Sequence, residues 1–236
     1  MTSKDEDKEK SLMDLATLDD FAHINPASIM VMSNSLHFHT LEQAFREAAQ
    51  TAENAGDAAA FRAFNVLAVV CSYHFNPSRP DTFSPQIIFN GKRTLIPSDY
   101  LGEQQVILVQ IAERIDHPLL RARIADSCWY VNRRLHAVAV LAASSYLNAV
   151  ELFFKRELLD QYGADFAVPF KVVDLIDRAF AIYASAGKRK EIPDSAKEVL
   201  KLAYETAKDN ECLAAFVRLS SIAQSNGLLE WQEIAA

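Results

Sequence analysis

The sequence predicts an all-α fold in which antiparallel helical hairpins stack into a solenoid that carries one small β-hairpin insertion. Half of the 236 residues are hydrophobic and only six are glycine, a composition that favours helix. Apolar residues recur at helical spacing along most of the chain. The connections between these segments are short, so neighbouring helices are expected to form antiparallel pairs, and repeated pairs stack.

The predicted domain organisation is simple. The length fits one large domain or two small ones. Residues 1–14 begin with a highly charged stretch and are expected to be a disordered tail. Residues 15–236 are expected to form one helical-repeat domain. Its helices are predicted at about residues 15–21, 40–55, 57–75, 99–115, 118–131, 135–159, 169–185, 194–209 and 211–225, with a last helical segment at 228–234.

Several helix boundaries are marked by particular residues. Thr40 and Gln43 form a possible capping box, and Gly56 is expected to end the helix that they begin. Asp57 is expected to cap the next helix. Pro118 suits the first turn of its helix, because the N–H that proline lacks has no helical partner there.

One segment between residues 76 and 97 breaks the helical pattern. Three prolines between residues 77 and 85 exclude a regular helix. Asn90-Gly91 stands between two β-prone runs, and an Asn-Gly pair is a strong signal for a tight hairpin turn with positive φ at both residues. We therefore predict a β-hairpin at residues 86–96.

Charge and cysteine content bear on compartment and partners. The net charge of -7 argues against a nucleic-acid binder, which needs Lys and Arg to neutralise phosphates. The three cysteines lie within apolar helical patterns and form no CxxC pair, which predicts buried thiols instead of disulfides or zinc ligands. The charged N-terminus lacks the apolar run of a signal peptide, and no long uninterrupted apolar stretch predicts a membrane span. We expect a cytoplasmic protein.

One helical pair resembles a tetratricopeptide unit. When that repeat is laid without gaps from Pro118, four residues take the positions at which its two helices meet. These residues, expected to form the structural core of the hairpin, are Ile124, Cys128, Ala137 and Leu141. Ala137 would be the small residue at the helix crossing. No second copy follows at that repeat's period of about 34 residues.

A longer stretch carries a more particular pattern. It runs from Ile96-Pro97-Ser98-Asp99 through Glu113-Arg114-Ile115-Asp116 to HPLLRARIADSCW at residues 117–129. The stretch resembles an uncharacterised bacterial helical-repeat family, a domain of unknown function normally found N-terminal to a HEPN-like helical domain. The resemblance covers roughly residues 96–160. It departs from the family at Ser127-Cys128, where an apolar pair is usual, and at Gly102 in the helix start.

The resemblance implies that the chain is the N-terminal part of a larger bacterial protein. HEPN ribonucleases use an Arg followed at a short, defined distance by a His. None of the six histidines has an Arg at that distance before it: His23, His37, His39, His74, His117 and His136. The nuclease motif of the HEPN superfamily is therefore not expected in this chain.

No pattern predicts catalysis. The sequence contains neither a nucleophile-elbow motif nor a glycine-rich phosphate loop. Cys128, beside Trp129 and seven residues before His136, suggests a thiol nucleophile only if it is accessible, and its core position argues against that. His37 and His39 could begin a metal site, but no further ligands are marked. We expect no catalytic residue, no metal and no cofactor.

An apolar stripe near the end of the chain is one candidate for partner binding. Leu228, Trp231 and Ile234 follow one another at helical spacing. Exposed apolar faces usually mark contacts, and Trp is enriched at interface centres. The stripe either packs back on the last helices or contacts a partner.

Three arginines form the other candidate site for a partner. Arg121, Arg133 and Arg134 lie around one predicted hairpin. They either cap carbonyls and pair with acidic neighbours, or bind an acidic partner.

These observations predict a non-catalytic protein-interaction or scaffold module. Its expected partner is the C-terminal region of a longer chain, another copy of itself or a second protein. Neither a membrane nor nucleic acid is expected. The alternative is a regulatory component of a bacterial defence or toxin system that acts with a HEPN-like nuclease domain. A third possibility, an enzyme of unrecognised type, would need a pocket that holds several polarised ionisable groups.

Overall fold

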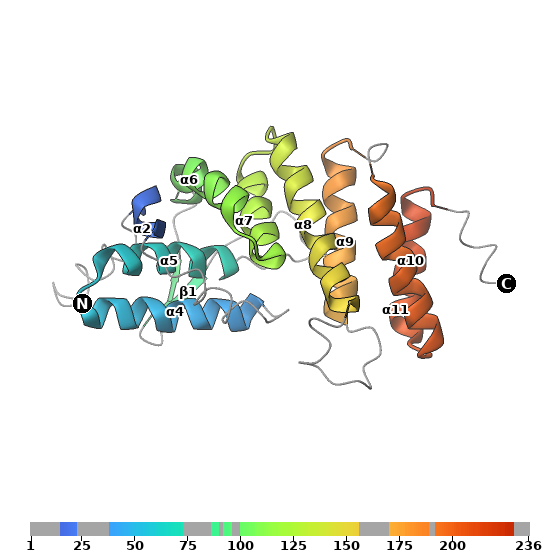
Figure 1. Cartoon of the computed structure of the whole chain (residues 1–236), viewed down its shortest axis with the longest axis horizontal. Coiled ribbons are helices and arrows are strands. Elements are labelled where there is room, and N and C mark those ends of the chain that lie inside the picture. Colours follow the sequence, from blue (N-terminus) through green and yellow to red (C-terminus); the bar gives the residue numbers. More distant parts are fainter. Residues whose placement is uncertain are drawn as a thin grey trace. The chain divides into compact units, whose positions relative to one another are not determined.

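The computed structural model describes residues 15–22, 38–72, 86–89, 92–95, 100–155, 170–188 and 192–228 (Figure 1). These residues contain nine α-helices and two short strands. The all-α class predicted from the sequence is confirmed, since adjacent helices pack as hairpins throughout the described residues. The chain divides into two compact units, Met1–Asn132 and Arg133–Ala236. The sequence does not mark this division.

The first unit contains five of the described helices: α2 (Leu18–Ala22), α4 (Phe38–Ala55), α5 (Ala58–Ser72), α6 (Tyr100–Arg114) and α7 (Pro118–Val131). Helix α4 pairs with α5, and α6 pairs with α7. Helix α5 also packs against α7, and the short helix α2 lies against α5. Helix α5 is therefore the centre of this unit, and almost every residue from Ala63 to Cys71 is buried.

The turn between α4 and α5 follows the predicted capping residues. Gly56 takes φ 73°, a left-handed conformation that glycine adopts without steric cost. The Asp57 carboxylate accepts a hydrogen bond of 3.0 Å from the Ala60 N–H, so the predicted cap is confirmed. The start of α4 differs from the prediction. This helix begins at Phe38, so Thr40 lies inside its first turn and is not the cap.

In the turn between α6 and α7, hydrogen bonds involve the N-cap residue of α7 and a side chain from the first turn of that helix. Pro118 is the first residue of α7, as predicted, and His117 is the N-cap. His117 Nδ1 accepts a hydrogen bond of 3.4 Å from the Leu120 N–H. Burial lowers the pKa of His117 to about 4, which keeps the ring neutral and able to accept.

Two strands lie between α5 and α6. Strand β1 (Gln86–Phe89) pairs antiparallel with β2 (Lys92–Leu95), with Gln86 opposite Leu95 and Phe89 opposite Lys92. Strand β1 contacts α5. The predicted turn residues Asn90 and Gly91 lie outside the described residues.

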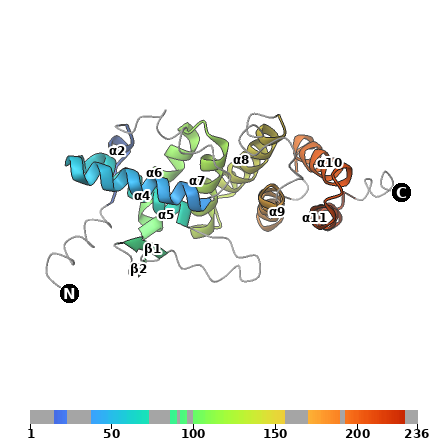
Figure 2. The same ribbon diagram turned by 90° about the horizontal axis from the view of Figure 1, so that it is seen from below.

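The second unit consists of two stacked hairpins. Its described helices are α8 (His136–Phe154), α9 (Phe170–Ser185), α10 (Asp194–Asp209) and α11 (Leu213–Ser225). Helix α8 pairs with α9 and α10 with α11, while α8 also contacts α10 and α9 contacts α11. Figure 2 shows α8 and α10 on one side of this unit and α9 and α11, seen nearly end-on, on the other. The α10–α11 hairpin therefore repeats the placement of the α8–α9 hairpin.

Helix α8 is both the longest and the most apolar of the described helices. Among the described residues it is the one helix long and apolar enough to cross a membrane. More than half of this stretch is buried inside the structure. A core helix passes the same test, so length and composition alone do not distinguish the two.

Candidate interaction surface

The four residues predicted to form a tetratricopeptide-like core differ in burial. Ile124 and Cys128 on α7 are buried, Leu141 on α8 is half-buried, and Ala137 is exposed. Ala137 lies in the first turn of α8, which begins at His136, and outside the buried stripe of that helix. Ile124 and Cys128 belong to the first unit, whereas Ala137 and Leu141 belong to the second, so the tetratricopeptide-like pairing of α7 with α8 stays a prediction.

The three candidate arginines are placed in different ways. Arg121 is half-buried, and its Nε donates a hydrogen bond of 2.7 Å to the Ile115 carbonyl just beyond the end of α6. Its guanidinium also lies 3.8 Å from the exposed Asp116 carboxylate. Arg121 thus bonds a carbonyl beyond a helix end and pairs with an acidic neighbour, which is the first of the two roles predicted for these arginines. Arg133 and Arg134 are exposed in the turn that follows α7.

The predicted C-terminal stripe is described only at Leu228. This residue is half-buried, and its N–H donates a hydrogen bond of 2.9 Å to the Ala223 carbonyl. Gly227 takes φ 72° and lets the chain close α11 in this way. Trp231 and Ile234 lie outside the described residues.

The motif at residues 117–129 is mainly an interior feature. Arg123, Asp126 and Trp129 are all buried on α7. Arg123 Nε donates a hydrogen bond of 3.3 Å to the Val70 carbonyl on α5, and its own carbonyl accepts one of 2.9 Å from Ser127. The sequence favours a structural role for the arginines around this hairpin, Arg123 included, but it does not predict burial, because an Arg in a helical pattern is usually exposed.

Two charged residues, Arg123 and Glu42, affect the pKa of the buried Cys71 thiol. Burial raises the pKa of Cys71 to about 12, the nearby Arg123 acts to lower it, and Glu42 acts to raise it. Glu42 is itself buried and forms an ion pair with Arg46 on the same helix. Helices α4, α5 and α7 therefore meet around buried charged groups.

The buried thiols are poor candidates for catalysis. Burial also raises the pKa of Cys128 to about 12, and the neighbouring Asp126 raises it further. Such thiols stay protonated at neutral pH, whereas the thiolate is the nucleophile. Among the residues that the structure describes, no group of three or more His, Cys, Asp or Glu side chains could hold a metal ion.

The outer side of α11 has a different character. Leu213 is 72% exposed and Val217 is 57% exposed. The other exposed residues of this helix are Ala214, Ser221, Gln224 and Ser225. The whole of α11 is described, and none of these residues carries a charge. The buried residues of α11 lie on its opposite side: Ala215, Leu219, Ile222 and Ala223.

The one charged residue of α11 is directed to the neighbouring helix. Arg218 Nη1 lies 2.7 Å from Asp174 Oδ1, and Arg218 Nη2 lies 3.2 Å from Asp177 Oδ2. Both carboxylates belong to α9. The charge of Arg218 is therefore balanced within the unit, and the exposed side of α11 stays uncharged.

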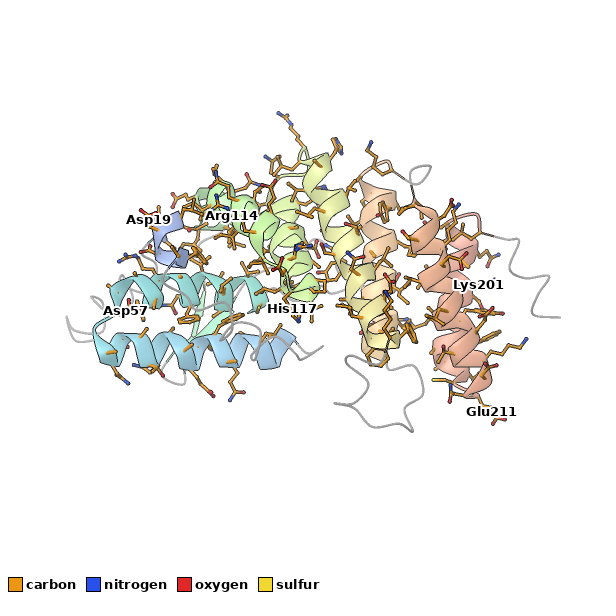
Figure 3. All side chains as sticks on the ribbon, viewed as in Figure 1. Asp19, Asp57, Arg114, His117, Lys201 and Glu211 are labelled. Carbon is orange, nitrogen blue, oxygen red and sulfur yellow. The ribbon has the colours of Figure 1, made fainter. Side chains whose placement is uncertain are left out.

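Helix α10 borders this side with charged residues of both signs. Tyr204 and Phe216 join the two helices, with ring centroids 4.6 Å apart. Lys201 is half-buried, and Figure 3 shows it on the side of α10 that points away from α8. The exposed charged residues of α10 are Asp194, Glu198, Glu205, Lys208 and Asp209. We name the exposed residues of α11 the α11 face, and the exposed charged residues of α10 its charged border.

Other exposed apolar residues are scattered. Among the described residues they are Leu15, Val106 and Val131 in the first unit and Leu202 on α10 in the second, each on a different segment. Single exposed hydrophobic residues are normal on protein surfaces. The α11 face differs because Leu213 and Val217 stand one helical turn apart with no charge between them on the exposed side.

The fold and this surface define the chain as a helical-hairpin protein. It belongs to the family described as the domain of unknown function DUF7380, which matches residues 11–195. The matched residues include all the described helices of the first unit and the α8–α9 hairpin, while α11 follows the match. No curated protein and no solved structure matches the chain.

Proposed function

We propose that this chain is a non-catalytic protein-interaction module that works in the bacterial cytoplasm. The observation that carries the proposal is the α11 face. It exposes Leu213 and Val217 on a helix whose outer side has no charge. Contact with another protein would remove these side chains from water, which favours association by roughly 25 cal/mol for each Å² of apolar surface.

The position of the α11 face in the stack supports the proposal. Helical-hairpin stacks need a polar outer face on their terminal hairpins, because nothing covers that side. The α10–α11 hairpin covers α8 and α9, and its own outer side along α11 lacks the expected charges. This side has the character of a surface that a further helix covers.

The solenoid interpretation rests on the second unit. The contacts of α8 with α10 and of α9 with α11 are those of two consecutive repeats in a helical stack. We propose a tetratricopeptide-like stack on this basis. In the register proposed from the sequence, α7 and α8 form one unit of that repeat, with Ala137 at their crossing.

The alternative function, regulation of a HEPN-like nuclease domain, rests on the resemblance of residues 96–160 alone. The buried positions of Arg123, Asp126 and Trp129 indicate that part of this stretch serves the fold. The alternative predicts that the purified chain changes the rate of RNA cleavage by a nuclease domain encoded with it. An unchanged rate with a bound nuclease would exclude it.

The proposed function is tested by cross-linking in cells that express a tagged chain at its natural level. Val217→Glu places a charge on the α11 face, and Val106→Glu makes the same change at a valine that is 71% exposed on α6. We expect one or more proteins, a second copy included, to cross-link to the wild type and to Val106→Glu but not to Val217→Glu. Equal cross-linking of all three would show that the α11 face is not the binding surface.

A further inference from the structure

We propose that the occupant of the α11 face is a second copy of this chain, packed antiparallel about a two-fold axis at Val217. This inference rests on the proposed function and adds the partner and the geometry. It uses α10 and α11 alone, and both belong to the second unit.

An uncharged face is suited to contact with itself. In a two-fold contact the same surface of both copies meets, so any charge near the axis approaches an equal charge. The α11 face exposes Leu213, Ala214, Val217 and Ser221 without such a charge. A contact between two different surfaces would need a second apolar patch, but the exposed hydrophobic residues in the described part of the first unit are isolated.

The Tyr204–Phe216 contact fixes the level of α10 beside α11. The two ring centroids lie 4.6 Å apart, so these residues lie at a similar height along the two helices. The helices are joined by a short turn and run in opposite directions. Val217 is therefore level with Ala203, and a two-fold axis perpendicular to the helices at Val217 also passes the middle of α10.

This axis gives a defined set of pairs along α11. Val217 meets Val217 of the second copy, and Leu213 lies opposite Ser221 of the second copy. The bulky Leu213 thus faces a small side chain, which leaves room for the two helices to approach closely. The Val217 pair lies on the axis and occurs once, whereas the Leu213–Ser221 pair occurs twice, once on either side of the axis.

The same axis makes the charged border on α10 complementary. Residues at equal distances on either side of Ala203 face each other across the axis. Lys201 then lies opposite Glu205 of the second copy, and Glu198 lies opposite Lys208 of the second copy. These two kinds of pair match opposite charges four times in the dimer. Charge complementarity of this kind selects one register over shifted ones.

Sedimentation velocity over a wide range of protein concentration tests the dimer. The wild type should show a monomer–dimer equilibrium, and Val217→Glu should be monomeric at every concentration, because two carboxylates would meet at the axis. Val106→Glu should dimerise as the wild type does. Circular dichroism should show equal helix content in all three proteins, since both valines are more than half exposed.

A charge swap tests the register. Lys201→Glu should weaken the dimer at least several-fold, because it places acidic groups opposite each other. Lys201→Glu combined with Glu205→Lys should restore it, because the pair across the axis is again of opposite sign. Failure of the double variant to recover would overturn the antiparallel register.

A cross-link tests the position of the axis. In a background with Cys212→Ser, which leaves two buried cysteines, Val217→Cys should be joined to its mate by a short bis-maleimide. Val106→Cys in the same background should not be joined. Efficient linkage at residue 106 and none at residue 217 would contradict the proposal.

The outcomes separate this inference from the proposed function. A wild type that stays monomeric at all concentrations, or a Val217→Glu dimer of unchanged affinity, overturns the second copy as partner. If the wild type is monomeric and yet cross-links in cells to another protein through the α11 face, the interaction module stands and the self-association fails. If no protein cross-links and no dimer forms, both proposals fail.

Discussion

The two units of this protein place charge in opposite ways. In the first unit, charged side chains are buried between helices, namely Asp20, Glu42, Arg123 and Asp126. In the second unit, no charged residue among those described is buried, and the exposed side of α11 carries none either. Charged side chains are thus part of the packing of the first unit, whereas we propose that the uncharged side of α11 contacts a partner.

The comparison predicts that arginine replacements have very different costs in the two units. Arg123→Ala should lower the free energy of unfolding of the first unit by about 2–5 kcal/mol, because it removes the donor to the Val70 carbonyl and leaves a cavity where a buried side chain lay. Arg218→Ala removes a partly exposed pair and should cost at most about 1 kcal/mol. Urea titration followed by Trp129 fluorescence, in a Trp231→Phe background, measures the first value. Similar costs for both variants would remove the distinction between the units.

Two residues of α11 sharpen the distinction between its two sides. Leu219 is fully buried, so Leu219→Ala should cost roughly 2–5 kcal/mol through the cavity that it leaves. Val217→Ala is expected to change stability by less than about 0.5 kcal/mol, since the side chain is mostly in water. Thermal unfolding at a concentration where the protein is monomeric measures both. A large loss for Val217→Ala would mean that this residue serves the fold instead of a partner.

The attachment of α2 to α5 gives a pH-dependent prediction. The Asp20 carboxylate accepts hydrogen bonds from Arg62 at 2.6 Å and 3.0 Å and from the Thr17 N–H at 2.7 Å. The hydrogen bond from Arg62 is the main cause that lowers the pKa of Asp20 below its ordinary value of 3.8. The stability that the Asp20 carboxylate contributes is therefore fully present above the pKa that Asp20 has in the unfolded chain. It is lost as the pH falls through the lower pKa that Asp20 has in the folded protein.

Asp20→Asn should therefore cost about 1.5–3 kcal/mol at neutral pH and progressively less in acid. Amide hydrogen exchange of α2 and the facing residues of α5 measures this local stability. The matched control is Asp19→Asn on the same helix, where the side chain is exposed. An equal effect of both substitutions would show that the Asp20–Arg62 contact does not hold α2.

A small gain in stability is expected from a change in the turn before α11. Glu211 takes φ 54°, the left-handed conformation that most side chains avoid. Glu211→Gly should raise the free energy of unfolding by about 0.5–1 kcal/mol, because glycine enters this region without steric cost. The melting temperature of the variant measures the gain, with Glu205→Gly in the middle of α10 as a control that should lose stability. A destabilised Glu211→Gly would contradict this account of the turn.

Features set by short-range chemistry could be predicted from the sequence. Asp57 and Pro118 lie where predicted, because capping and proline geometry depend on adjacent residues alone. The start of α4 could not be placed, because the first turn of a helix depends on distant neighbours as well as on the local sequence. The burial of Arg123 was missed for the same reason, since its partner Val70 is on another helix.

The candidate site was only partly visible in the sequence. The segment LAAFVRLSSIAQS contains a single charged residue, and that signal was available. What the sequence lacks is the direction of each side chain: whether Arg218 or Val217 faces solvent is decided by Asp174 and Asp177 on α9. The sequence predicts partner binding at another apolar stripe, formed by Leu228, Trp231 and Ile234. Of these residues, the structure describes only Leu228.

The central claim is that the uncharged side of α11 is a binding surface and not a part of the core. Sedimentation velocity of Val217→Glu beside Val106→Glu tests it most directly, because the two proteins have the same composition and each carries its change at an exposed valine. The account predicts a dimer for Val106→Glu and a folded monomer for Val217→Glu at the same concentration. Two proteins with indistinguishable sedimentation at every concentration would contradict it.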